Sequence, residues 1–147
     1  MNLATPHECM YELPTTFSAT ANSTQDQELW KTESTEEFEV GIPPVFGGSK
    51  ECTSPEDFLA LALANCYIAT FKTIAKKSSV AFQSIEVTCR LEIDKTEHGI
   101  QATQAHTHVQ IHANNQEKVR SIAKVAHDKC IIHNAVTFDT HIDVDIQ

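Results

Sequence analysis

The sequence is short of positive charge, and the shortage is uneven along the chain. Only 11 lysines and arginines stand against 20 aspartates and glutamates, which gives a formal net charge of −9. The whole imbalance falls within residues 1–60, and the first arginine of the chain is Arg90. Because an acidic surface repels phosphate backbones and anionic lipid headgroups, we expect neither nucleic acid nor a membrane surface as a partner.

Long apolar runs and closely spaced cysteines are missing as well. The longest nearly apolar stretch, 58–71, has 14 residues, whereas a membrane span needs about 20. The chain opens without the basic segment and apolar run of a secretory signal. Its five cysteines include no pair with the spacing of a zinc site, and their odd number argues against a secreted disulfide framework. We therefore expect a cytoplasmic protein with reduced thiols, no metal and no cofactor.

What is present suffices for one globular domain. The chain has 147 residues, of which 41% are hydrophobic. A domain of this size can bury a core without the help of metals or disulfides. No internal repeat or low-complexity linker divides the sequence, so we predict a single domain over residues 1–147.

The first half of the sequence predicts strands followed by one long helix. Residues 8–40 contain short alternating stretches typical of two or three half-exposed strands, and the prolines and glycines of 42–48 exclude regular structure there. Ser54-Pro55-Glu56-Asp57 is a strong helix start, and the helical pattern continues to about Lys77. Apolar residues surround this helix almost completely, which indicates burial between a sheet and a second cover. A second copy of the chain is the obvious cover.

The second half predicts a hairpin, a helix and a last strand. Apolar and polar residues alternate over 85–93 and again over 103–111. Asn114 or Asn115 can cap a helix whose apolar positions reach Cys130, and a final alternating strand covers 138–146. This order of elements indicates an α+β fold with an antiparallel sheet.

Two cysteines are the leading candidates for chemistry. Cys66 stands midway along the long helix, and Cys130 stands at the end of the second helix. A free cysteine in a buried helix is most often a small apolar side chain. A thiol with a pKa of about 8.5 is only ~3% thiolate at neutral pH, so a reactive role requires a nearby cation or hydrogen-bond donor.

The motifs around these cysteines resemble a known family. Residues 47–71 combine Gly47-Gly48, the Ser54-Pro55-Glu56 helix start and, ten residues after Glu56, Cys66. In these motifs, and in a second cysteine after the next long helix, the sequence resembles the OsmC/Ohr family of osmotically inducible and organic hydroperoxide resistance proteins. The resemblance implies an OsmC-like α+β fold, with an antiparallel sheet and a long buried central helix, in an intertwined homodimer.

The resemblance also implies a thiol peroxidase that reduces organic hydroperoxides. Cys66 would attack the peroxide and become a sulfenic acid, and Cys130 would condense with it to a Cys66–Cys130 disulfide. A dithiol of the lipoyl type would then reduce this disulfide. Glu56 would be the third site residue. It lies about 15 Å from Cys66 along one helix, so it would have to act across the dimer or through an intermediary. Its alternative role is to complement the helix dipole.

One departure from the family pattern keeps other functions open. Peroxidatic members pair the cysteine with an N-terminal arginine, whereas here only Lys31 and Lys50 are available. A carboxylate without its cation raises the pKa of a thiol, and lysine lacks the planar fork of arginine. The alternatives are a non-catalytic OsmC-fold protein that binds a small apolar ligand or senses redox state, and an interaction module in which the thiols have no role.

Several histidines and the remaining cysteines are weaker candidates. His106, His108 and His112 share one face of a strand, where two could ligate zinc, but polar neighbours favour a solvated surface. His133 could act as a base for Cys130, and a structural histidine at the surface is the favoured interpretation. The other three cysteines are expected to be a core residue and two incidental thiols: Cys89, Cys9 and Cys52.

Overall fold

The computed structural model describes residues 12–147, and the chain divides into two compact units. One unit ends at Ser54 and the other begins at Pro55. Cys9 lies outside the described residues. The single domain over residues 1–147 stays a prediction.

The first unit is built on a three-stranded antiparallel sheet in the order β1-β2-β3. Its elements are β1 (Thr20–Asn22), β2 (Leu29–Glu33), β3 (Glu37–Gly41) and a 3-10 turn at Pro44–Phe46. The strands are mostly exposed, whereas the alternating sequence predicted half-exposed strands. Gly47 follows the 3-10 turn with a φ of 97°, a left-handed conformation that glycine adopts without steric cost.

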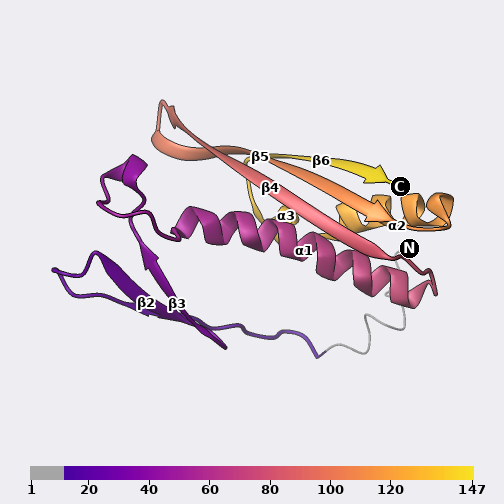
Figure 1. Cartoon of the computed structure of the whole chain (residues 1–147), viewed down its shortest axis with the longest axis horizontal. Helices are drawn as coiled ribbons and strands as arrows, with labels where there is room; N and C mark the ends of the chain where they lie inside the picture. The colour runs from indigo at the N-terminus through magenta and orange to yellow at the C-terminus, as the bar shows by residue number, and fades with distance from the viewer. Residues whose placement is uncertain (1–11) are drawn as a thin grey trace. The chain divides into compact units, whose positions relative to one another are not determined.

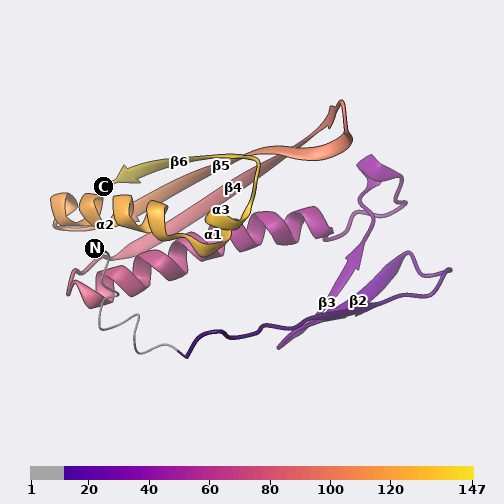
Figure 2. The same cartoon turned by 180° about the vertical axis from the view of Figure 1, so that it is seen from behind.

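The second unit combines a three-stranded sheet with three helices. Its elements are α1 (Pro55–Lys77), β4 (Ser84–Thr96), β5 (Gly99–His112), α2 (Gln116–Lys129), α3 (Ile131–Ala135) and β6 (Asp139–Ile146). Figures 1 and 2 show α1 and α2 on the same face of this sheet. Along β4 and β6 the alternate side chains that face away from the helices are exposed. The unit therefore has two layers, helices on one side and sheet on the other, as expected for an α+β fold.

The sheet of the second unit is mixed rather than wholly antiparallel. β4 and β5 pair antiparallel as predicted, from Ser84 opposite His112 to Thr96 opposite Gly99. β6 pairs with β5 in parallel. The difference arises because the chain passes through α2 and α3 between β5 and β6, and such a crossover returns it to the end of the sheet where β5 began.

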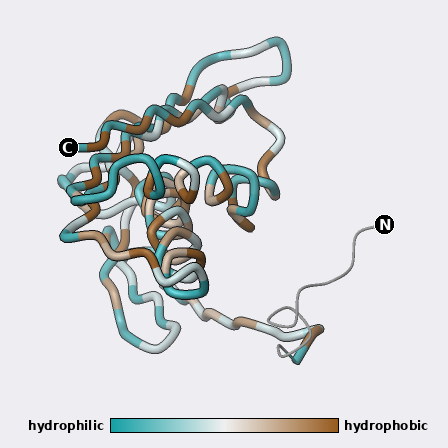
Figure 3. Tube along the Cα trace, turned by 90° about the vertical axis from the view of Figure 1, so that its right-hand side faces the viewer, coloured by the Kyte–Doolittle hydropathy of each residue, from teal (hydrophilic) through white to brown (hydrophobic). Residues whose placement is uncertain are grey.

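Helix α1 begins at Pro55 and ends at Lys77, as the sequence predicted. Its buried residues, Leu63, Ala64, Tyr67, Phe71 and Ala75, recur every three or four positions and form one face. The prediction of a buried helix is therefore confirmed for this face. On another face, Leu61 is 51% exposed. The hydropathy colouring of Figure 3 lets the reader follow the apolar residues along the chain.

Among the described residues, α1 is also the helix that is long and apolar enough to cross a membrane by length and composition. A single such helix is weak grounds for a membrane protein, because core helices share these properties.

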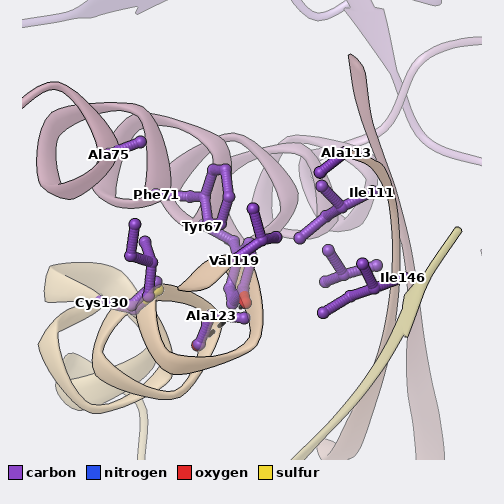
Figure 4. Close-up of a cluster of buried hydrophobic side chains, with 12 residues drawn as sticks. Tyr67, Phe71, Ala75, Ile111, Ala113, Val119, Ala123, Cys130 and Ile146 are labelled. Atoms are coloured by element: carbon purple, nitrogen blue, oxygen red, sulfur yellow. Dashed lines mark hydrogen bonds between the residues drawn. The ribbon is translucent and has the colours of Figure 1, made fainter. Parts of the chain in front are cut away.

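The core lies between α1, α2 and the sheet, as Figure 4 shows. Tyr67 stacks on Phe71 with ring centroids 6.5 Å apart, and Phe71 meets the ring of Phe82 edge-on at 5.1 Å. Full burial of such a side chain contributes about 1.5–3 kcal/mol.

The side chain of Asn115 caps α2 by accepting a hydrogen bond from the Lys118 N–H at 3.1 Å. Of the two predicted capping residues, Asn114 and Asn115, the structure therefore uses Asn115.

Candidate functional site

The fold brings together two thiols that are far apart in the sequence. Cys66 lies at the middle of α1, and Cys130 lies between the end of α2 and the start of α3. Because α1 packs against both α2 and α3, the two side chains lie close enough for Cys66 to raise the pKa of Cys130. Both are free thiols. The structure thus places the two predicted cysteines in one site.

The two thiols differ in their exposure to solvent. Cys66 is half-buried, whereas Cys130 has no exposed surface. Burial and, to a smaller extent, the adjacent Cys66 raise the pKa of the Cys130 thiol to about 12, while a hydrogen bond with Thr70 acts in the opposite direction. Cys130 is therefore a neutral thiol at neutral pH.

The sulfur of Cys66 also receives a hydrogen bond from the backbone. The N–H of Ile132 donates to Cys66 Sγ at 3.4 Å. Ile132 belongs to α3, a single helical turn that the sequence analysis missed because nothing in residues 128–136 marks a break between two helices. The break is at Cys130, whose backbone is extended (φ −65°, ψ 111°). The bond therefore links the Cys66 sulfur to the turn that follows Cys130.

Tyr67 holds the helix that carries Cys66 against α2. Its hydroxyl donates a hydrogen bond to the carbonyl oxygen of Ala123 at 3.0 Å, in the interior of the unit (Figure 4). Burial raises the pKa of Tyr67 well above its usual value, so the hydroxyl keeps its proton. The sequence analysis assigned no role to Tyr67, although its place next to Cys66 was an available sign of a positioning role.

Glu56, the third predicted site residue, is not brought to the thiols of its own chain. It lies in the first turn of α1, about 15 Å along the helix from Cys66. Its Oε2 atom is buried and accepts no hydrogen bond within the part of the chain that the structure describes. An unpaired buried carboxylate oxygen is costly, so this atom is suited to a donor from outside the described chain.

The two lysines of the first unit are already paired at its surface. Lys31 Nζ lies 3.0 Å from Glu37 Oε1, and Lys50 Nζ lies 3.4 Å from Glu28 Oε2. Both lysine side chains are more than half exposed, at 58% and 60%. Each positive charge therefore has a carboxylate partner in its own unit, and neither takes the place of the missing arginine there.

His133 is buried, so the prediction of a surface histidine was wrong. It is 6% exposed, and neither ring nitrogen has a hydrogen-bond partner among residues 12–147. The reason is the turn of α3, which directs His133 inward and leaves Ile131 75% exposed. Burial, with a smaller effect of nearby His127, lowers the pKa of His133, so the ring is neutral at pH 7.

The histidine face of the sheet has a member that the sequence did not reveal. His141 of β6 stacks on His106 of β5, with ring centroids 5.0 Å apart and an interplanar angle of 18°. The parallel pairing of β5 with β6 places them opposite each other. His108 is exposed as predicted. Over residues 12–147, no three histidine, cysteine or acidic side chains converge as metal ligands would.

Comparisons with known proteins agree with the fold. The family profile of OsmC-like proteins matches residues 47–146. An OsmC-like protein of unknown function from Vibrio cholerae is similar in structure, with a TM-score of 0.80 and 16% identity over 90% of this chain and 100% of that one. No curated protein matches the chain in sequence.

Two similar structures carry a more specific name. The organic hydroperoxide resistance protein OsmC of Legionella pneumophila has a TM-score of 0.74 and 20% identity, over 92% of this chain and 99% of its own. An organic hydroperoxide resistance protein of Elizabethkingia anophelis has a TM-score of 0.75 and 21% identity, over 93% and 99% of the two chains. At this identity the likeness is one of fold.

Proposed function

The chain belongs to the OsmC-like family, and from this premise we propose that it is a thiol-dependent peroxidase that reduces organic hydroperoxides through Cys66 and Cys130. The observation that carries the proposal is the position of Cys66 against the turn that follows Cys130, where the Ile132 N–H donates to Cys66 Sγ at 3.4 Å. The names of the Legionella and Elizabethkingia proteins support the substrate class. Membership of the family supports a role in defence against oxidative stress.

The surroundings of the two thiols support an order of reaction. Cys66 is the accessible one and accepts the N–H of Ile132, so it is the better candidate for the thiolate that meets the peroxide. Cys130 is fully buried and held neutral, so it is protected from the peroxide and from solvent. It suits the second step, in which a thiol next to Cys66 is needed.

The proposed chemistry needs three steps. The Cys66 thiolate attacks the O–O bond, takes one oxygen as a sulfenic acid, and the remaining alkoxide leaves as an alcohol after taking a proton. The Cys130 thiol then attacks the sulfenic sulfur, a disulfide forms and water leaves. A dithiol reductant exchanges with this disulfide, restores both thiols and becomes oxidised to its own disulfide.

The proposed active form is a homodimer built on the open face of α1. In an antiparallel pair of α1 helices centred on Leu61, position 56 of one copy lies opposite position 66 of the other. Leu61 is the large apolar side chain of α1 that remains exposed, and Glu56 Oε2 is without a partner within the described residues. This arrangement would bring Glu56 to the thiol site of the second copy, which it does not reach in its own chain.

A non-catalytic redox sensor is the second candidate, and one observation favours it. The cations of the first unit, Lys31 and Lys50, are paired with surface carboxylates. The resemblance to peroxidatic members of the family implies a cation that pairs with the reactive cysteine, and both of these lysines are already engaged elsewhere. A sensor needs only one oxidation per event, whereas a peroxidase needs rapid turnover.

The test is consumption of cumene hydroperoxide with dihydrolipoamide as the electron donor. We expect sustained turnover by the wild type and its loss in Cys66→Ser. Cys89→Ser is the matched control, because Cys89 lies on β4 and is half-buried like Cys66. Turnover that persists in Cys66→Ser would contradict the proposed peroxidase.

Intact mass measurement separates the two candidates. One equivalent of peroxide should produce a Cys66–Cys130 disulfide in both cases. Oxidation without sustained turnover would favour the sensor. A protein that forms no disulfide and consumes no peroxide would exclude both candidates.

A further inference from the structure

A groove separate from the two thiols runs between α2 and β6. It has a volume of about 490 Å³, within the range of small-molecule sites. Its lining comes from one face of α2 and from the inward side of β6: Glu117, Arg120, Ser121, Ala123, Lys124, His127, Ile142 and Val144. The proposed peroxidase chemistry uses none of these residues.

The floor of the groove is apolar. Ala123 is buried in α2, and Ile142 and Val144 are half-buried side chains of β6 that pack against the core. β6 is the edge strand of its sheet, whose order is β4-β5-β6. The helix α2 covers the side chains of Ile142 and Val144 only in part. An apolar chain laid on this floor would remove further hydrophobic surface from water.

One side of the groove is positively charged, in a protein whose net charge is −9. Arg120 and Lys124 are one helical turn apart on α2, so they lie on the same face. Both are exposed, and neither forms an ion pair with a carboxylate of residues 12–147. Two unpaired cations side by side repel each other, and an anion placed between them relieves this repulsion.

Glu117 sets the direction of the occupant. It lies one turn before Arg120, near the start of α2, and it is the one carboxylate of the lining. An anionic group is therefore repelled from that end and attracted to the stretch between Arg120 and Lys124. The hydroxyl of Ser121 takes no part in this, because it donates its hydrogen bond to the Glu117 backbone carbonyl oxygen at 3.3 Å.

From this combination we propose that the groove binds an amphipathic organic anion, namely a carboxylate carried on an alkyl chain. The carboxylate lies between Arg120 and Lys124, and the alkyl chain lies on Ala123, Ile142 and Val144. The site is distinct from the thiols, but it adjoins the support of Cys66, since the carbonyl of Ala123 accepts the hydrogen bond of Tyr67.

The test is a titration of the ¹⁵N-labelled full chain with decanoate, followed by amide chemical shifts. Saturable shifts are expected at Ala123, Ile142 and Val144. The double substitution Arg120→Gln/Lys124→Gln should weaken decanoate binding about tenfold, because two exposed charge contacts are lost. Lys118→Gln is the matched control on α2, because Lys118 does not line the groove and its substitution should leave the affinity unchanged.

Decanol tests the role of the charge. It has the same chain without the carboxylate, so it should bind the wild type about as weakly as decanoate binds the double variant. Absence of saturable shifts, shifts confined to α1, or equal affinities of wild type and double variant for decanoate would each overturn the proposal. Cys66→Ser should bind decanoate normally, so this result does not depend on the peroxidase.

Discussion

At the scale of single residues, burial decides which of the neighbouring groups can carry charge. Cys130 and His133 are three positions apart and both are buried, and both are held in the neutral form. The difference is in their partners, because Cys130 has Cys66 and Thr70, whereas both nitrogens of His133 are unpaired within the described chain. His133 is therefore a cost to stability rather than a support of the site.

The pH dependence of stability should show this cost. The pKa of His133 is lower in the folded than in the unfolded chain, so below about pH 6.5 the unfolded chain binds the proton more readily. Stability is therefore lost as the pH falls from about 6.5 through the folded pKa. We expect His133→Leu to reduce this loss, measured as the change in the urea unfolding midpoint between pH 7.5 and pH 5.

The control for this measurement is His98→Leu, because the side chain of His98 is 73% exposed in the turn between β4 and β5. It should keep the acid-induced loss of the wild type. If His133→Leu loses as much stability as the wild type between the two pH values, the burial of an unpaired His133 is not the cause.

At the scale of elements, the site depends on how three helices meet. α1 supplies Cys66, the end of α2 leads to Cys130, and α3 supplies the N–H that reaches the Cys66 sulfur. The hydrogen bond from Tyr67 to Ala123 connects α1 with α2 next to this junction. The geometry of the thiols is therefore a property of helix packing.

Removal of the Tyr67 hydroxyl should weaken this junction. We expect Tyr67→Phe to lower the free energy of unfolding by about 0.5–1.5 kcal/mol, the usual net value of one hydrogen bond, as measured by urea denaturation. Thr73→Val is the control, because its hydroxyl bonds to the Ala69 carbonyl within α1 at an exposed position. It should change stability by less than about 0.5 kcal/mol. Equal effects of the two substitutions would refute the connecting role of Tyr67.

The elements also show where sequence reasoning succeeds and where it stops. The bounds of α1 and the alternation of β4 and β6 were predictable, because they depend on local capping and on periods of 3.6 and 2 residues. The direction of β6, the turn of α3, the burial of His133 and the stacking of His141 on His106 were not. Each depends on packing between segments distant in the sequence, which a local pattern does not encode. The meeting of Cys66 and Cys130 was implied by the family motifs rather than by the residues alone.

At the scale of the whole molecule, the face of α1 that carries Leu61 is left uncovered by the rest of its own unit. α1 is apolar almost all round, yet its buried residues form one face and Leu61 remains half exposed. A single exposed apolar residue is common at a protein surface, but here Leu61 lies on the same helix as Glu56, whose buried Oε2 has no partner among the described residues. The proposed dimer covers this face and gives Glu56 a site to act on.

We expect the wild type to have a solution mass of twice the 16.3 kDa chain, measured by light scattering during size-exclusion chromatography. Leu61→Asp should shift it to the monomer mass, because two desolvated carboxylates would face each other across the dimer axis. Val125→Asp is the control, since Val125 is an exposed apolar residue of α2, 43% exposed, outside this face. A wild type of single-chain mass, or a Leu61→Asp variant that remains a dimer, would exclude pairing through this face. Glu56 would then be left with its helix-dipole role.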